Sequence, residues 1–171
     1  KHDDSLDAPY LRKAFSASGK PTRARLYICG PGYFDAYING KRVSDEELPT
    51  PFTQFDARLL YCTYDVTEHL QSGDNAIGIL VGNGWYNCFT QDVWDTRQAS
   101  WRHIPKGIAE LHLEHEDGSK DVIKTDSSWK SAPSPIIFNG IRNGEHFDAN
   151  LIQTGWDAPG FDDSDWANAK V

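Results

Sequence analysis

The sequence has few of the features that mark disulfide frameworks, zinc sites or membrane spans. Its three cysteines, Cys29, Cys62 and Cys88, are odd in number and widely spaced, which matches neither a disulfide framework nor a paired zinc motif. We interpret them as small apolar side chains. No continuous apolar stretch approaches the length that crosses a bilayer, so we expect no membrane insertion. Residues 1–10, KHDDSLDAPY, lack the charged-then-apolar order of a signal peptide.

Positive charge is also scarce. The chain carries 17 Lys and Arg against 25 Asp and Glu, which gives a formal net charge of −8. This negative field repels phosphate backbones and anionic lipid headgroups. The six histidines show no metal-ligand spacing. The composition therefore disfavours nucleic acid and membrane surfaces as partners.

Motifs of nucleophilic and nucleotide chemistry are absent from the sequence. There is no G-x-S-x-G, no Walker loop and no G-x-G-x-x-G that opens a helix. A glycosidase needs two carboxylates on either side of one bond. Asp56, Glu145 and Asp148 are candidates, but no spacing pairs an acid with a base. We therefore expect a non-catalytic chain, with a stand-alone glycosidase as the less favoured alternative.

Turn residues and aromatic residues are abundant, with 14 Gly, 9 Pro, 6 Trp and 7 Tyr. No long stretch keeps a helical period. Short runs of β-branched and aromatic residues recur instead, as is typical of a β-rich domain with many turns. These runs are PYLRKAF, ARLYICG, YFDAYI, LLYCTYDV, AIGILV, GIAELHLEH and DVIKTD.

Turn signals between these runs predict how the strands connect. Asn39-Gly40 and Asp117-Gly118 each predict a β-hairpin. A single helical turn is expected to begin near Asp65 and to end near Gly73. About eight to ten strands joined mostly by hairpins indicate an all-β antiparallel sandwich, with a jelly-roll as the favoured topology. We expect one domain over residues 1–171, with its core at about residues 8–166.

The segment 87–105 is the longest one without a clear strand pattern. Loops of this length in compact domains usually carry function or are disordered. Trp94 and Trp101 argue against disorder, because large aromatic side chains gain most from burial. We therefore expect an ordered loop.

The segment GNGWYN at residues 82–87 is the main candidate binding element. Asn83 stands between two glycines at the end of an apolar strand, and its amide can bind sugar hydroxyls or a cation. Trp85 and Tyr86 either offer flat faces to a sugar ring or pack in the core. The residues alone leave both alternatives open.

A second candidate element is NGEHFDAN at residues 143–150. Its alternation places Glu145 and Phe147 on one face of an extended segment, and one face should meet the core. Glu145 then either forms an ion pair with an arginine such as Arg58 or Arg142, or lies at the rim of a cleft.

Calcium is the metal that this sequence could hold. Calcium takes oxygen ligands from several loops, so its site leaves no compact spacing. Asp56, Asn83 and a carbonyl near Pro135 would converge if their strands end at the same edge. The alternative is an aspartate in a turn and an asparagine in the left-handed conformation.

Five sequence segments, in their order along the chain, resemble the N-terminal β-sandwich module of bacterial α-L-rhamnosidases. The resemblance runs from about Ala8 to Trp166, and it implies a jelly-roll, galactose-binding-like fold. In the full enzyme this module precedes a helical-barrel catalytic domain that hydrolyses terminal α-L-rhamnose, and nothing in this chain is similar to that barrel. The five segments are GYFDAYINGKRV, FDARLLYCTYDVTEHL, NAIGILVGNGWYN, NGEHFDAN and GWDAPGFDDSDW.

The same resemblance implies a role. Some members are similar to calcium-dependent rhamnose-binding modules, whose cation and sugar contacts fall on Asp56 and Asn83, with the Pro135 carbonyl a looser match. The favoured function is thus a non-catalytic module that assists carbohydrate recognition by calcium-assisted rhamnose binding. Its partners would be rhamnosides and the catalytic domain of the same polypeptide. The alternative is a structural sandwich without sugar affinity. A periplasmic or secreted bacterial enzyme is expected from the resemblance.

Overall fold

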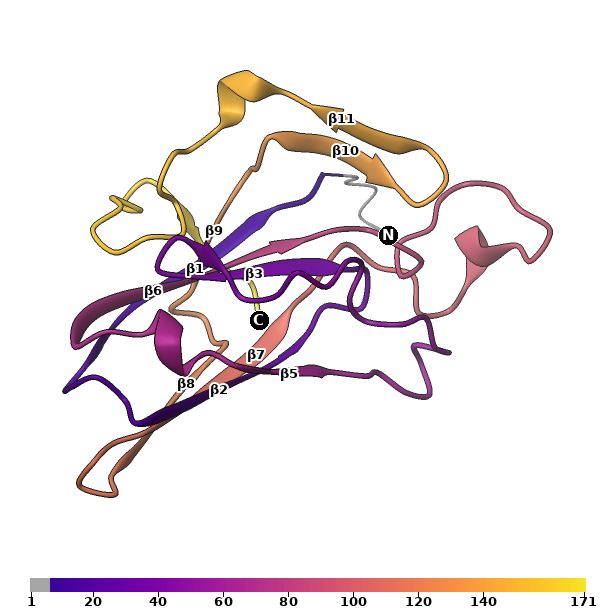
Figure 1. The fold of residues 1–171 in the computed structure, drawn as a ribbon. Helices are drawn as coiled ribbons and strands as arrows, with labels where there is room; N and C mark the ends of the chain where they lie inside the picture. The colour runs from indigo at the N-terminus through magenta and orange to yellow at the C-terminus, as the bar shows by residue number, and fades with distance from the viewer. Residues whose placement is uncertain (1–6) are drawn as a thin grey trace.

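The computed structural model describes residues 7–171, whose strands form two packed antiparallel sheets (Figure 1). The larger sheet has the order β12 (Ala167–Asn168), β9 (Lys130–Ala132), β1 (Tyr10–Ala17), β6 (Gly73–Val81), β3 (Phe34–Ile38) and β4 (Lys41–Arg42). The smaller sheet has the order β5 (Cys62–Asp65), β2 (Arg23–Cys29), β7 (Ile108–Glu114) and β8 (Lys120–Lys124). The predicted jelly-roll β-sandwich is confirmed. Residues 1–6, part of the segment predicted to lack a signal peptide, lie outside the described residues.

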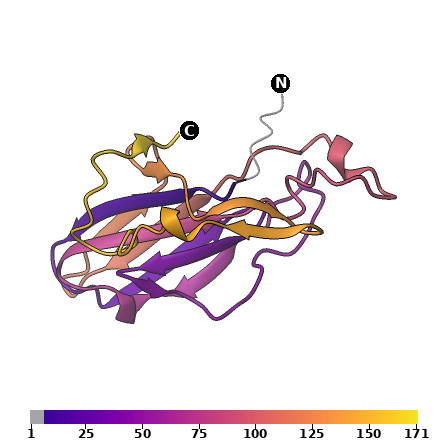
Figure 2. The same cartoon turned by 90° about the horizontal axis from the view of Figure 1, so that it is seen from above.

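A separate hairpin adds a third layer. It consists of β10 (Ile136–Gly140) and β11 (Gly144–Phe147). In Figures 1 and 2 this hairpin runs along the larger sheet, on the side away from the smaller sheet. The backbone N–H of Ala8 donates to the carbonyl of Ile136 at 3.0 Å, which ties the hairpin to the chain just before β1. The hairpin ends in a short 3-10 helix, η3 (Ala149–Leu151).

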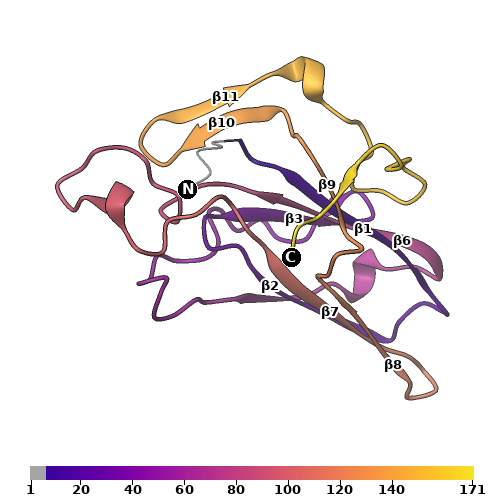
Figure 3. The same cartoon turned by 180° about the vertical axis from the view of Figure 1, so that it is seen from behind.

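The core lies between the two sheets, where alternate residues of each strand meet. Leu26 and Ile28 of β2 face Ile77 and Ile79 of β6, and each is at most 1% exposed. Side chains of a strand alternate between its two faces, so these apolar residues at every second position fill one layer. Figure 3 shows the sandwich from behind, with β2, β7 and β8 of the smaller sheet below β1 and β3 of the larger sheet. Each such buried side chain contributes about 1.5 to 3 kcal/mol to folding.

Both predicted hairpins are confirmed. β3 and β4 pair Ile38 with Lys41. Asn39 and Gly40 between them have φ angles of 52° and 78°, the left-handed values that a two-residue hairpin turn requires. β7 and β8 are joined across Asp117-Gly118. The predicted helical turn is the 3-10 helix η1 (Thr67–His69), which ends before the expected position because the strand β6 already begins at Gly73.

The C-terminal segment is fastened to the larger sheet. The Tyr10 ring of β1 stacks on Trp156 with 4.0 Å between ring centroids and lies parallel to Trp166 at 6.0 Å. Arg12, which is 1% exposed, donates from Nε to the Trp156 carbonyl at 2.7 Å and also pairs with Asp163. A buried guanidinium with its donors satisfied makes this attachment specific, because removal of a partner would leave a buried charge unpaired.

Candidate functional site

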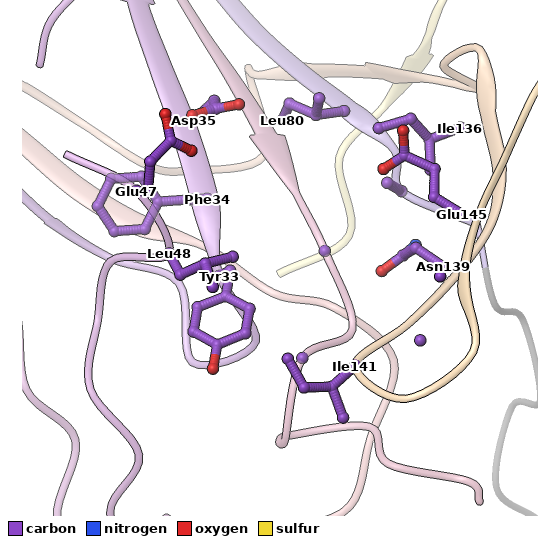
Figure 4. Close-up of a pocket in the computed structure, with 15 residues that line it drawn as sticks. Tyr33, Phe34, Asp35, Glu47, Leu48, Leu80, Ile136, Asn139, Ile141 and Glu145 are labelled. Atoms are coloured by element: carbon purple, nitrogen blue, oxygen red, sulfur yellow. The ribbon is translucent and has the colours of Figure 1, made fainter. Parts of the chain in front are cut away.

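A groove of about 310 Å³ lies between β3, the end of β6 and the β10–β11 hairpin (Figure 4). Asp35 and Glu47 stand on one wall, and Asn139 and Glu145 stand on the other. Apolar side chains, among them Leu80, lie between the two walls. The groove therefore combines carboxylate and amide oxygens with an apolar floor, and the sequence had indicated only Glu145 among these polar groups.

The two glycines of GNGWYN line this groove because the backbone crosses itself there. Gly84 has a φ of 48°, and a Cβ atom on it would lie 1.9 Å from the carbonyl oxygen of Gly32. A Cβ atom on Gly32 would lie equally close, 1.9 Å, to the carbonyl oxygen of Gly82. No side chain fits at such a distance, so this crossing requires glycine. The Gly-Asn-Gly turn is thus a structural junction under the groove.

Asn83 is fully buried within this junction and does not line the groove. Its Nδ2 donates to the carbonyl of Asn139 at 3.0 Å, and its backbone N–H donates to the Asn139 side-chain oxygen at 2.8 Å. Its Oδ1 accepts from Nδ2 of Asn87 at 2.6 Å. Both ends of the amide are therefore engaged inside the protein. Asn83 pins the turn after β6 to strand β10, and a ligand could reach it only if the hairpin moved.

The two aromatic residues of the motif have different surroundings. Tyr86 is 9% exposed and packs edge-on against Phe55, with 5.5 Å between centroids. Burial, with a smaller effect of Cys29, raises the pKa of the Tyr86 hydroxyl. Tyr86 is therefore a core residue. Trp85 is half-buried, and the guanidinium of Arg142 lies 5.5 Å from its ring centroid.

Glu145 is exposed on β11 and lines the groove, as a cleft rim would require. The predicted alternative of an ion pair with Arg58 or Arg142 is wrong, since no such pair occurs among the described residues. The expectation that one face of this segment meets the core is also wrong. Phe147 is 56% exposed and all of β11 lies at the surface, because the hairpin stands outside both sheets.

The opposite wall is organised by Arg42 of β4. Its Nη2 lies 2.5 Å from Asp35 Oδ1, and its Nη1 lies 3.1 Å from Glu47 Oε1. The hydrogen bonds that Arg42 donates to Asp35, and then those to Glu47, raise the pKa of Arg42 above its usual range. Each carboxylate keeps a second oxygen that can accept further hydrogen bonds. The wall thus offers fixed acceptors whose charge Arg42 partly offsets.

The three predicted calcium ligands each have a partner of their own. The Asp56 carboxylate accepts from the Ser100 hydroxyl at 2.6 Å, and this hydrogen bond is the main cause that lowers the pKa of Asp56. The Pro135 carbonyl accepts from the backbone N–H of Asp148 at 2.8 Å. Pro135 also lies four residues before Asn139, the hairpin residue that Asn83 contacts. Four residues of extended chain span about 13 Å. A calcium site at these positions stays a prediction.

The described residues contain no group of three or more His, Cys, Asp or Glu side chains placed to hold a metal ion. No helix in this part of the chain combines the length and the apolar character to cross a membrane. The three cysteines are free, and Cys29 and Cys88 are buried, as their interpretation as apolar side chains predicts.

The long loop after the motif is ordered around the tip of the hairpin, but it does not bury both tryptophans. Trp101 is half-buried beside Phe55, with 5.9 Å between centroids. Trp94 is 69% exposed, so burial does not order its ring. Its ring lies over the guanidinium of Arg142, 5.4 Å from the centroid, and this stacking outside the sandwich replaces core packing. Figure 2 shows the loop projecting from the sandwich.

Comparison with known families gives a match to the α-L-rhamnosidase N-terminal domain over residues 19–171. Among curated relatives, two α-L-rhamnosidases of Formosa agariphila are 33% and 38% identical over 98% and 96% of this chain. A third relative, from Alteromonas sp., is 35% identical over 92% of this chain. The chain spans 17 to 18% of the length of these relatives.

Solved structures give the same result. The α-L-rhamnosidase of Aspergillus terreus superposes with a TM-score of 0.90 at 37% identity, over 98% of this chain and 19% of that one. The Streptomyces avermitilis α-L-rhamnosidase, solved with L-rhamnose, gives 0.88 at 35% identity over 95% of this chain and 16% of that one. A lectin of Pleurotus ostreatus, 18% identical over 97% of this chain and 36% of that one, shares the fold with a TM-score of 0.61.

Proposed function

Because this chain belongs to the α-L-rhamnosidase N-terminal domain family, we propose that it serves a rhamnosidase as a non-catalytic module that holds rhamnose in the groove. The hydrolysis itself belongs, in this proposal, to the part of the relatives that this chain does not match, more than four fifths of their length. The site is the groove between β3, β6 and the β10–β11 hairpin.

The observation that carries this proposal is the arrangement of acceptors on the two facing walls. Glu145 and Asn139 stand on the hairpin wall, and Asp35 and Glu47 stand opposite. Sugar hydroxyls are donors, so a pyranose between these walls can donate to both sides at once. The apolar floor at Leu80 suits the methyl group and the C–H face of rhamnose.

Calcium assistance is a separate part of the proposal. Direct hydrogen bonds to carboxylates need no metal. A metal that bridged protein and sugar would have to displace Arg42 from Asp35 and Glu47, or open the junction around Asn83. We therefore propose metal-independent binding in the groove, and calorimetry with calcium and with a chelator separates the two modes.

The test is calorimetric titration of the chain with L-rhamnose, repeated on Glu145→Ala. Loss of a hydrogen bond to a charged acceptor should weaken binding about tenfold or more. Glu145 is exposed, so the substitution leaves the fold intact. Glu116→Ala, at an exposed carboxylate of the β7–β8 hairpin, is the matched control and should bind like the parent. Absence of heat with L-rhamnose in the parent chain would refute the proposal.

A second candidate function is packing against the rest of the enzyme. Large apolar side chains are exposed on the two long loops: Phe52 at 52%, Tyr61 at 67%, Val93 at 89% and Trp94 at 69%. These loops extend from one end of the sandwich in Figure 1. Exposed apolar groups gathered in this way mark interaction surfaces. Hydrogen exchange of both loops, slower in the full-length enzyme than in this chain, would support packing.

A further inference from the structure

Arg142 occupies the turn of the β10–β11 hairpin, directly beside the groove. Its neighbour Ile141 lines the groove, and so does Gly84, the neighbour of Trp85. The guanidinium carbon lies 5.5 Å from the ring centroid of Trp85 and 5.4 Å from that of Trp94. Two indole rings therefore hold one flat cation at the end of the proposed sugar site.

The N–H donors of this guanidinium have no hydrogen-bond acceptor among the residues that the structure describes. No hydrogen bond or ion pair to Arg142 occurs among residues 7–171. Arg142 helps to lower the pKa of Asp92, but the carboxylate of Asp92 already accepts other hydrogen bonds. Asp92 accepts hydrogen bonds from the Thr96 hydroxyl and from the backbone N–H of Trp94, and both donors belong to the same loop as Asp92. Stacking orients the guanidinium of Arg142, and the residue is exposed to solvent.

Such an arrangement has a definite ligand chemistry. A stacked guanidinium presents parallel N–H donors that match the two oxygens of a carboxylate. The groove itself disfavours an anion, because Asp35, Glu47 and Glu145 line it. A neutral sugar in the groove and an acidic sugar at the hairpin turn would therefore be bound in one fixed orientation.

We propose that Arg142 binds the carboxylate of a uronic acid linked to the rhamnose in the groove, so that the module selects acidic rhamnose-containing chains. This inference rests on the proposed function, because it places rhamnose in the groove first. It adds a charged subsite that the family resemblance did not indicate. Arg142 had been considered only as an ion-pair partner of Glu145.

The test compares two ligands of equal size. One is a disaccharide of α-L-rhamnose linked to glucuronic acid, and the other is its uncharged methyl ester. The parent chain should bind the acid about tenfold more tightly than the ester, and this preference should shrink at high salt. Arg142→Gln should remove the preference and retain the affinity for L-rhamnose. Arg142→Lys should keep only part of the preference, because lysine lacks the planar fork.

Control experiments distinguish a failure of the acidic subsite from a failure of rhamnose binding in the groove. Arg23→Gln removes the same charge at the far end of β2, where Arg23 lies near Glu114, and it should leave the preference intact. Unchanged thermal melting of Arg142→Gln shows that the hairpin remains folded. If L-rhamnose binds but acid and ester bind equally, the inference is overturned and the proposed function stands. If neither disaccharide nor L-rhamnose binds, both are overturned.

Discussion

Replacement of Asn83 by alanine tests whether this side chain is a structural pin. The change removes the hydrogen bond from Nδ2 to the Asn139 carbonyl and the hydrogen bond from Asn87 to Oδ1. Each contributes about 1 kcal/mol, and a buried partner left without a bond costs about 1 to 3 kcal/mol. Asn83 and Asn87 are both at most 1% exposed. We therefore expect the free energy of unfolding to fall by about 2 to 4 kcal/mol.

Equilibrium unfolding in urea, followed by tryptophan fluorescence, measures this loss. Asn150→Ala is the matched control, because Asn150 is exposed and its amide bonds only to the Asp148 carboxylate of the same turn. The control should change stability by less than about 0.5 kcal/mol. A similarly small loss for Asn83→Ala would refute the structural role. Full stability combined with lost rhamnose binding would make Asn83 the ligand that the sequence first indicated.

Three further changes probe the glycine crossing, the attachment of the C-terminal segment and the long loop. Gly84→Ala should strongly destabilise the chain in thermal melting, because its Cβ would lie 1.9 Å from a backbone oxygen, whereas Gly19→Ala meets nothing within 4 Å and should be neutral. Arg12→Ala should lower the free energy of unfolding in urea by about 3 to 5 kcal/mol, because it leaves the Trp156 carbonyl and the partly exposed Asp163 carboxylate without their partner. Hydrogen bonds from Thr96 lower the pKa of Asp92, so its stabilisation is present above the unfolded value of about 3.9. That stabilisation is lost as the pH falls through the lower folded pKa. Asp92→Asn should therefore speed hydrogen exchange of its loop at pH 7 and make no difference in strong acid.

The fold could be predicted because its signals are local. Alternation along runs such as ARLYIC indicates which side chains face the core, and Asn39-Gly40 specifies a tight hairpin through its left-handed backbone. The extra β10–β11 layer was not predicted. Its strands are exposed on most of their positions, so they lack the apolar alternation that marks a strand packed on a core.

The site could be predicted only in part, because residue type does not determine exposure. Asn83 has the chemistry of a ligand, but the chain around it crosses the backbone of Gly32, which is distant in the sequence, and this crossing encloses Asn83. Trp94 has the size of a core residue, but a cation on another element holds it at the surface. For Glu145 the sequence left an ion pair and a cleft rim as alternatives, and in the structure this residue lines the groove, because an unpaired carboxylate is costly to bury.

The groove illustrates why spacing along the chain could not reveal it. Its carboxylates come from β3, from the loop after β4 and from β11, and they meet only because the larger sheet sets β3 beside β6 while the hairpin lies across the end of β6. The glycine crossing determines that geometry, since it brings the turn after β6 close enough for Asn83 to reach β10. Asn83 is enclosed in this junction and cannot also face a ligand. The Gly-Asn-Gly turn that first suggested a binding loop is therefore a structural junction, and the polar groups of the groove lie on the walls beside it.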